Sequence, residues 1–243
     1  LASSVRDLRC IVCLLEDEDL RLADSTVTSR EMTASLREQF NAVFGQLQGD
    51  GLLLSWDSQF PNVAQLVAGE KVRGSWWSHK RARTIFAVSE MLEDHPDVMI
   101  VKLISGKVTF VHRELWNRIY SVGVAREDWQ LKKLSTTAKA LVKAVDQAGC
   151  IQTDKLGKEF GAKPGDTARE LESRLLIHAE QIHTESGKHA KVLETWNTWA
   201  KRVGFRARAT NPVAARRFIE ERVAEINRKY QANGALPWSL QSH

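Results

Sequence analysis

The sequence predicts a mostly α-helical protein with short β-hairpins, in the α+β class, and three observations support this prediction. Apolar residues recur at spacings of three and four in several segments, as they do on the buried face of a helix. In two places this spacing gives way to alternation on both sides of a glycine-containing turn, which is typical of a β-hairpin. Hydrophobic residues make up 43% of the chain and charged residues 27%, a balance typical of globular proteins.

Three helices are predicted between residues 134 and 175. Ser135 is placed to cap the first helix, which Gly149 ends. Thr153 can cap a second, short helix, and Asp166 can cap the third. The side chains expected to be buried are Ala138, Leu141, Val142 and Val145 in the first helix, Leu156 and Phe160 in the second, and Ala168, Leu171 and Leu175 in the third.

A β-hairpin is predicted after these helices. Its apolar residues alternate on both sides of a turn at Ser186 and Gly187. Those expected to face the core are Leu175, Ile177, Ala179, Ile182, Ala190 and Val192. Three helices followed by a hairpin are the order of a winged helix-turn-helix, so residues 134–200 are predicted to form one such unit.

The same order is fainter upstream. Helices are predicted over 33–48, within 60–70 and over 76–95, where Ser75 is the cap of the last. The inward side chains would be Val63, Leu66 and Val67 in the second helix. In the hairpin that follows the third helix, the alternating residues are Val98, Ile100 and Lys102 before the turn and Val108, Phe110 and His112 after it. Residues 30–120 are therefore predicted to form another winged-helix unit.

The remaining segments are assigned around these two units. Residues 1–29 are an N-terminal segment, residues 121–133 a linker, and residues 201–243 a basic C-terminal helix and tail. Trp116 and Trp129 are expected to anchor the linking region.

The C-terminal helix begins at the cap and first-turn pair Asn211 and Pro212. Its apolar stripe is Val213, Phe218, Ile219, Val223, Ile226 and Tyr230, and its opposite face carries Arg216, Arg217, Arg222 and Arg228. The last dozen residues are predicted to be an extended tail. Residues 201–243 hold nine Lys/Arg against three Asp/Glu, whereas residues 1–60 hold five against ten. This asymmetry indicates either an anionic partner for the C-terminal half or a solvated basic helix.

The stretch RGSWWSHKRAR, residues 73–83, joins two tryptophans to a run of cations. On a continuous helix from residue 76, Trp77 lies on the core stripe and Trp76 on an exposed one. The core stripe adds Ile85, Val88 and Leu92, and the exposed stripe adds Lys80 and Arg83. An exposed Trp76 is suited to stack on an unpaired base while cations hold phosphates. The alternative is that Trp76 packs between the two units.

The third helix of the second unit is the other candidate contact, because winged helices bind DNA with that helix. Arg169 and Arg174 would read or hold DNA, with Lys163 before the helix and Lys188 at the wing tip. Lys80, Arg81 and Arg83 would form a second contact. Glu170 and Glu172 oppose this arrangement, since affinity for the DNA backbone comes from net neutralisation of phosphates.

Motifs of common catalytic sites are missing from the sequence. It contains no Walker-type loop, Gly-x-Ser-x-Gly elbow or His-Glu-x-x-His helix. Cys10 and Cys13 lack a second pair of zinc ligands, so these thiols and Cys150 are expected to be buried in a cytoplasmic protein. No cofactor or metal is expected. Each histidine is expected to make a structural hydrogen bond, and His79 with Glu114 or Asp57 would be the acid–base pair if one forms.

Three blocks of the sequence resemble a group of bacterial tandem winged-helix proteins to which no chemistry is assigned. The blocks are RGSWWSHKRARTIFAV, KVTFVHRELW and HTESGKHAKVLETW, and the resemblance covers most of residues 52–200. More distantly, the tandem arrangement is similar to winged-helix DNA glycosylases, which position water with a Gln-x-Gln pair. That resemblance implies that Gln46 and Gln48 are the matching pair, in a chain with fewer winged helices than those enzymes.

Three functions follow as hypotheses. The preferred one is binding of nucleic acid, most simply DNA, without catalysis. The second is an enzyme acting on nucleic acid, with Gln46, Gln48 or His79 near the chemistry. The third is a docking module in which Trp76 and the C-terminal helix contact a protein partner or a second copy. No apolar run approaches the roughly 20 residues that span a bilayer, so no membrane partner is expected.

Overall fold

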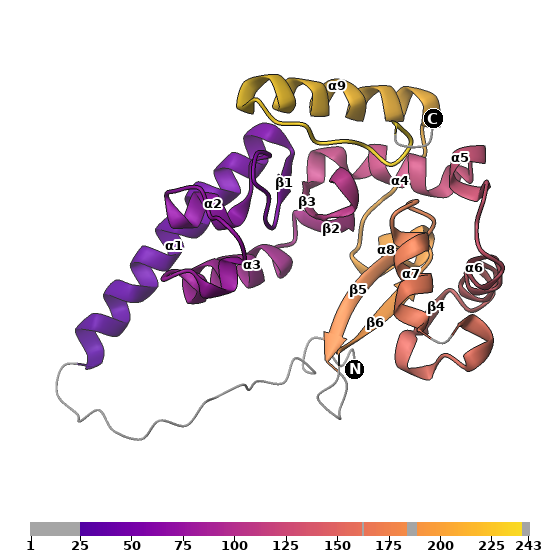
Figure 1. The fold of residues 1–243 in the computed structure, drawn as a ribbon, viewed down its shortest axis with the longest axis horizontal. Coiled ribbons are helices and arrows are strands. Elements are labelled where there is room, and N and C mark those ends of the chain that lie inside the picture. Colours follow the sequence, from indigo (N-terminus) through magenta and orange to yellow (C-terminus); the bar gives the residue numbers. More distant parts are fainter. Residues whose placement is uncertain (1–24, 162, 184–188, 240–243) are drawn as a thin grey trace.

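The computed structural model describes residues 25–161, 163–183 and 189–239. It shows an α+β protein with two small antiparallel sheets (Figure 1). Within these residues no helix combines the length and apolar character needed to cross a membrane.

The first sheet belongs to the N-terminal unit. Its elements are α1 (Ser25–Asp50), β1 (Leu52–Leu54), α2 (Val63–Ala68), the 3₁₀ turn η2 (Trp76–Ser78), α3 (Ala82–Glu93), β2 (Val98–Lys102), η3 (Ile104–Gly106) and β3 (Val108–His112). The central strand β3 pairs antiparallel with β1 on one side and β2 on the other. The hairpin predicted over this region is confirmed, whereas the three-residue strand β1 was not foreseen.

The second sheet belongs to the C-terminal unit and repeats this order. Its elements are α6 (Thr136–Ala148), β4 (Cys150–Gln152), the turns η5 (Thr153–Lys155) and η6 (Lys158–Phe160), α7 (Pro164–Glu172), β5 (His178–His183) and β6 (His189–Glu194). The central strand β6 pairs antiparallel with β4 and β5. The turn expected at Ser186 and Gly187 lies outside the described residues.

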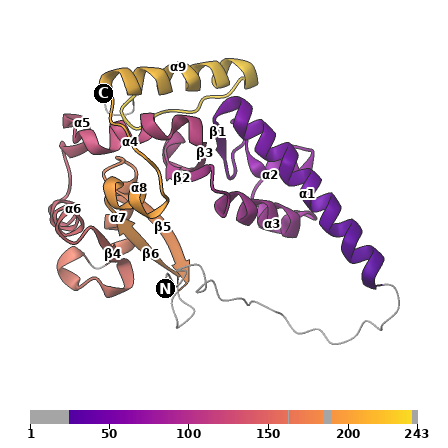
Figure 2. The same cartoon turned by 180° about the vertical axis from the view of Figure 1, so that it is seen from behind.

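The other helices join the two units. They are η4 (Arg113–Leu115), α4 (Trp116–Ala125) and α5 (Asp128–Leu131) between the units, and α8 (Trp196–Arg202) and α9 (Pro212–Tyr230) after them. The largest contact between two helices is that of α4 with α9. Figures 1 and 2 show α9 lying along the outer side of α4 in both views.

Both faces of the first sheet are buried, each by a different part of the chain. Val98 and Phe110 pack with α1, α2 and α3 in the N-terminal cluster. Met99 and Val111 lie in a central cluster with residues from α4, α8 and α9. A third cluster, around Leu193, fills the C-terminal unit. Successive side chains of a strand point to opposite faces of the sheet, so each strand contributes to both clusters. This sheet therefore connects the N-terminal unit to the rest of the protein.

The central cluster is shared by both halves of the chain. It contains Trp116 of α4, Trp196 and Trp199 of α8, Ile219 of α9 and Trp238 near the C-terminus, all at most 6% exposed. Trp116 is buried in this cluster and the half-buried Trp129 packs against it, so both tryptophans expected to anchor the linking region contact the cluster. Trp238 lies in the predicted tail and is buried in this cluster, because an indole of this size is stabilised by burial when a cluster is within reach.

An ionic contact also connects the two units. Glu172 of α7, with a side chain 7% exposed, lies 3.0 Å from Lys102 Nζ of β2 and pairs with Lys191 of β6. Burial lowers the pKa of Lys191, and its contact with Glu172 opposes this shift. A buried carboxylate with two ammonium partners holds β2 against the C-terminal unit.

Local capping predictions are confirmed where a side chain contacts the first turn. Ser135 accepts a hydrogen bond from Ala138 N. Asn211 accepts hydrogen bonds from the amides of Val213 and Ala214. All four apolar residues expected on the inner face of α6 are buried.

Two predictions in the C-terminal unit are wrong. The short helix after Thr153 is replaced by the separate turns η5 and η6. The helix expected to start at Asp166 is α7, whose cap is Lys163 and whose first residue is Pro164. Proline has a fixed φ suited to the first turn and needs no hydrogen-bond donor there, so the helix starts earlier.

Several apolar side chains lie on faces opposite to those predicted. Leu66 of α2 is 40% exposed, and Val213 and Phe218 of α9 are 58% and 38% exposed. In β6, Ala190 is buried as expected, but Val192 is half-buried and the strand's contribution to the core is Leu193, which pairs with Ala179. A spacing of three or four residues fits more than one helical stripe, and the stripe facing the core depends on tertiary packing.

Candidate functional site

The tryptophan pair lies at the entrance to α3. Gly74 has a left-handed φ of 74°, a conformation that glycine adopts without strain. The chain then forms η2, returns to extended backbone at His79, and begins α3 only at Ala82. The predicted continuous helix is therefore wrong over residues 76–81.

This interruption exchanges the environments predicted for the two tryptophans. Trp76 is half-buried and packs against the N-terminal cluster, whereas Trp77 is 63% exposed. Their rings stack with centroids 4.0 Å apart and planes at 23°. Phe86 of α3 is 43% exposed, and its ring lies 5.6 Å from that of Trp77. Trp76, Trp77 and Phe86 together are called the aromatic platform.

The prediction identified Trp76 but missed Trp77 and Phe86. A sequence signal for the exposed phenylalanine is present, because Phe86 follows Arg83 by three residues and so shares its side of a helix. A continuous helix places Trp77 on the core stripe, and the break at His79 reverses this assignment.

Five cations surround the platform in the sequence and are called the basic rim: Lys71, Arg73, Lys80, Arg81 and Arg83. Glu70 Oε1 lies 3.7 Å from Lys80 Nζ and 3.3 Å from His79 Nε2. Glu70 and Lys80 are exposed, so their attraction contributes at most about 1 kcal/mol. The other four cations of the rim form no ion pair with the described residues, and all but the half-buried Arg81 are exposed.

The cations predicted near α7 are less available. Arg169 is 65% exposed and lies 3.1 Å from Asp166. Lys163 is exposed at the start of α7. Arg174 instead donates from Nη1 to the backbone oxygens at the end of α5, at 3.0, 3.3 and 2.8 Å for Trp129, Gln130 and Lys132. Arg174 therefore holds α5 in place, and Lys188 lies outside the described residues.

The arginines of α9 are mostly paired with carboxylates. Arg216 lies 2.9 Å from Glu127, and Arg217 lies 3.1 Å from Glu221. Arg222 is 3.8 Å from both Glu114 and Glu225. Most of the positive charge counted on this helix is thus locally neutralised.

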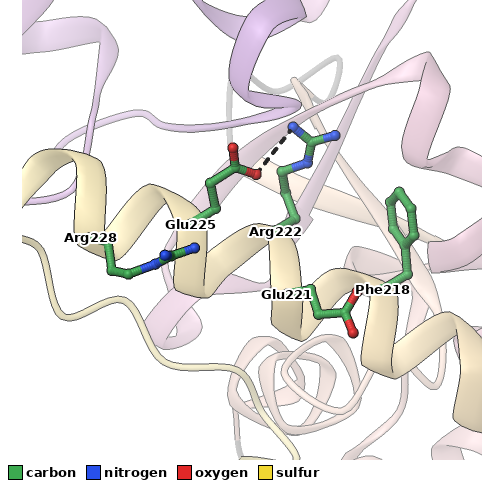
Figure 3. A pocket seen from close by; sticks show the side chains of 5 residues that line it. All are labelled: Phe218, Glu221, Arg222, Glu225 and Arg228. Carbon is green, nitrogen blue, oxygen red and sulfur yellow. Dashed lines mark ion pairs between the residues drawn. The ribbon is translucent and has the colours of Figure 1, made fainter.

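A hollow of about 260 Å³ lies along α9 (Figure 3). Its lining consists of Phe218, Glu221, Arg222, Glu225 and Arg228. Two acidic and two basic side chains give it no preferred ligand charge, so it is a weaker candidate than the basic rim.

A buried ionic network lies on the second sheet. Glu194, 1% exposed, lies 3.0 Å from His178 Nδ1 and accepts hydrogen bonds from Arg202 Nη2 at 2.5 Å and Nε at 3.1 Å. Burial alone would raise the pKa of Glu194, but the hydrogen bonds with His178 and Arg202 outweigh it and lower the pKa. The hydrogen bonds to Glu194 raise the pKa of Arg202. Because Glu194 and His178 are both buried and paired, this network is structural, as expected for a histidine.

Cys150 is exposed, which corrects the expectation that it would be buried. It pairs in register with Glu194 across the sheet. Burial of part of the thiol and the nearby Glu194 charge both raise its pKa. The thiol is thus held in its protonated, weakly nucleophilic form, while Cys10 and Cys13 lie outside the described residues.

The residues suggested for catalysis do not converge. Gln46 donates to Tyr230 Oη at 2.5 Å and to Asp50, whereas Gln48 is exposed. Two positions apart on a helix correspond to about 200° of rotation, so these amides point to different sides of α1. His79 contacts Glu70, and Asp57 pairs with Lys107 at 2.5 Å. The acid–base pair with Glu114 or Asp57 is absent from this geometry.

In the part of the chain that the structure describes, no three His, Cys, Asp or Glu side chains are grouped as metal ligands. No family model, curated protein or solved structure matches the chain. The strongest candidate site is therefore identified by geometry alone, as the aromatic platform with its basic rim.

Proposed function

We propose that the chain binds nucleic acid, most simply DNA, as a tandem winged-helix protein without catalysis of its own. In each unit a helix and a short strand precede further helical segments and a two-stranded hairpin, and the last strand is central in the sheet. This is the order of a winged helix, in which the third helix contacts DNA. In the N-terminal unit that helix is α3.

The observation that carries the proposal is the basic rim at the start of α3. Four of its cations have no ion pair among the described residues, and the fifth has only an exposed one. Unpaired cations displace counterions from phosphates on binding, which supplies sequence-independent affinity. Lys163, the N-cap of α7, and Arg169 in the last turn of α7 are exposed and can add a second contact.

The proposal is tested by the affinity for a DNA duplex as a function of salt concentration. Each phosphate contact contributes about −0.9 to the slope of log K against log salt, so five contacts give a slope of roughly −4 to −5. Replacing Lys80, Arg81 and Arg83 together with alanine should make the slope less steep by up to about 3.

A matched control removes the same charge elsewhere, at Lys139, Lys143 and Arg217, which are exposed on α6 and α9. The control should keep most of the affinity. Absence of binding to both duplex and single-stranded DNA at low ionic strength contradicts the proposal, as does an equal loss in both triple variants.

The alternatives have less support. A glycosylase-like activity lacks a converging glutamine pair, and a base-release assay on alkylated duplexes should give no product. A docking role draws on exposed Val213 and Phe218, and light scattering after size exclusion would reveal a homo-oligomer. A cytoplasmic location belongs to the proposal, because an exposed free thiol at Cys150 is preserved in a reducing compartment.

A further inference from the structure

Trp77 is the most exposed large apolar side chain among the described residues, at 63%. Tryptophan is strongly buried on average, so such exposure leaves a large apolar surface in water. One face of the ring is covered by Trp76 at 4.0 Å. Trp77 is 63% exposed even with Trp76 and Phe86 beside it, so ring surface is left open to a flat ligand.

The open ring is held in position before any ligand arrives. Trp76 packs against the N-terminal cluster, and Trp77 stacks on Trp76 with Phe86 beside it. A side chain fixed in this way loses little rotamer freedom on binding. The aromatic platform is thus preorganised for a stacking contact.

We propose that Trp77 stacks on an unpaired base of a single-stranded nucleic acid while the basic rim holds the flanking phosphates. This inference rests on the proposed function and adds the class of ligand. Residues 71–83 contain five Lys/Arg and no Asp/Glu, which complements a polyanion and not an apolar protein surface. Inside a duplex both faces of a base pair are stacked, so only an unpaired base offers a free face to the indole.

The test compares single-stranded and duplex DNA, using an oligothymidylate of roughly 20 nucleotides, which exceeds the common site size of about 4–16. Trp77→Ala should weaken binding to the single strand by about 5- to 150-fold, the range for loss of one base stack. Trp77→Phe keeps a ring and should lose less. The salt dependence should stay unchanged in both variants, because no phosphate contact is removed.

Val213→Ala is the matched control, since Val213 is a similarly exposed apolar residue on α9, and its affinities should equal those of the wild type. The exposure of Trp77 makes misfolding of the variants unexpected, and circular dichroism verifies this. If the aromatic platform instead docks a protein, Trp77→Ala will leave the affinities for single-stranded and duplex DNA unchanged. That result overturns the inference.

The two proposals fail in different ways. Suppose that the wild type binds duplex DNA. If Trp77→Ala then weakens binding to single-stranded and duplex DNA equally, or weakens binding to neither, the stacking inference is wrong and nucleic-acid binding stands. If the wild type binds neither probe at low salt, both proposals are wrong.

Discussion

Replacing Glu194 with glutamine should destabilise the protein substantially, because the carboxylate is buried and joins two basic side chains. Removing one partner of a buried ion pair costs about 3–5 kcal/mol. The side chain of Arg202 is 41% exposed and keeps Glu180 at 2.8 Å, so part of its charge stays compensated by solvent and by that carboxylate. We therefore expect a loss at or below the lower limit of this range, about 2–3 kcal/mol.

Thermal and urea unfolding measure this loss directly. For a domain of 150–250 residues, each kcal/mol lowers Tm by about 2–4 °C, which gives a fall of roughly 4–12 °C. Glu221→Gln is the control, because the exposed pair of Glu221 with Arg217 contributes little. The control should stay within about 0.5 kcal/mol of the wild type.

The pH dependence has a definite sign. The pKa of Glu194 is lowered in the folded state, so its stabilisation is fully present above the unfolded value of about 4.3 and is lost as the pH falls through the folded pKa. The difference between wild type and Glu194→Gln should narrow below about pH 4. Equal stability of Glu194→Gln and the control at neutral pH would refute the reasoning, as would a difference that does not shrink in acid.

Three further predictions concern single positions. Gly123→Ala places a Cβ 2.2 Å from Trp196 Nε1 and should lower the free energy of unfolding in urea by about 1–3 kcal/mol. The control Gly45→Ala meets nothing within 4 Å and should stabilise α1 by up to about 1 kcal/mol. Equal effects of the two substitutions would contradict this packing. Arg174→Ala leaves the carbonyls of Trp129, Gln130 and Lys132 without this donor and should speed amide exchange in α5 while leaving α9 unchanged. With the other two cysteines replaced by serine, Cys150 should react more slowly with a disulfide reagent at pH 7.5 than a free cysteine derivative does, because its pKa is raised; an equal or faster rate would contradict the raised pKa.

The parts of the fold that could be predicted from sequence are those specified by neighbouring residues. Ser135 and Gly149 delimit α6, and Asn211 with Pro212 starts α9, because caps act within one turn of the chain. The strand β1 was missed because its three leucines are all buried, which removes the alternation that reveals a strand.

The candidate site was only partly predictable for a related reason. The run of cations before α3 is visible in the sequence, and so is the presence of one exposed tryptophan. Which tryptophan is exposed depends on the break between η2 and α3, and the spacing of the apolar residues does not reveal this break. The same limit applies to Arg174, whose carbonyl partners lie more than 40 residues away in the chain.

The position of α9 has a consequence for protein synthesis. Its buried residues Ala215, Ile219, Val223 and Ile226 cover α4, yet α9 leaves the ribosome long after α4 does. At about 5–20 residues per second, the apolar side of α4 stays uncovered in the nascent chain for several seconds or more. A ribosome-bound chain arrested before Asn211 should therefore recruit chaperones. Once α9 has been synthesised and has left the ribosome, that recruitment should end.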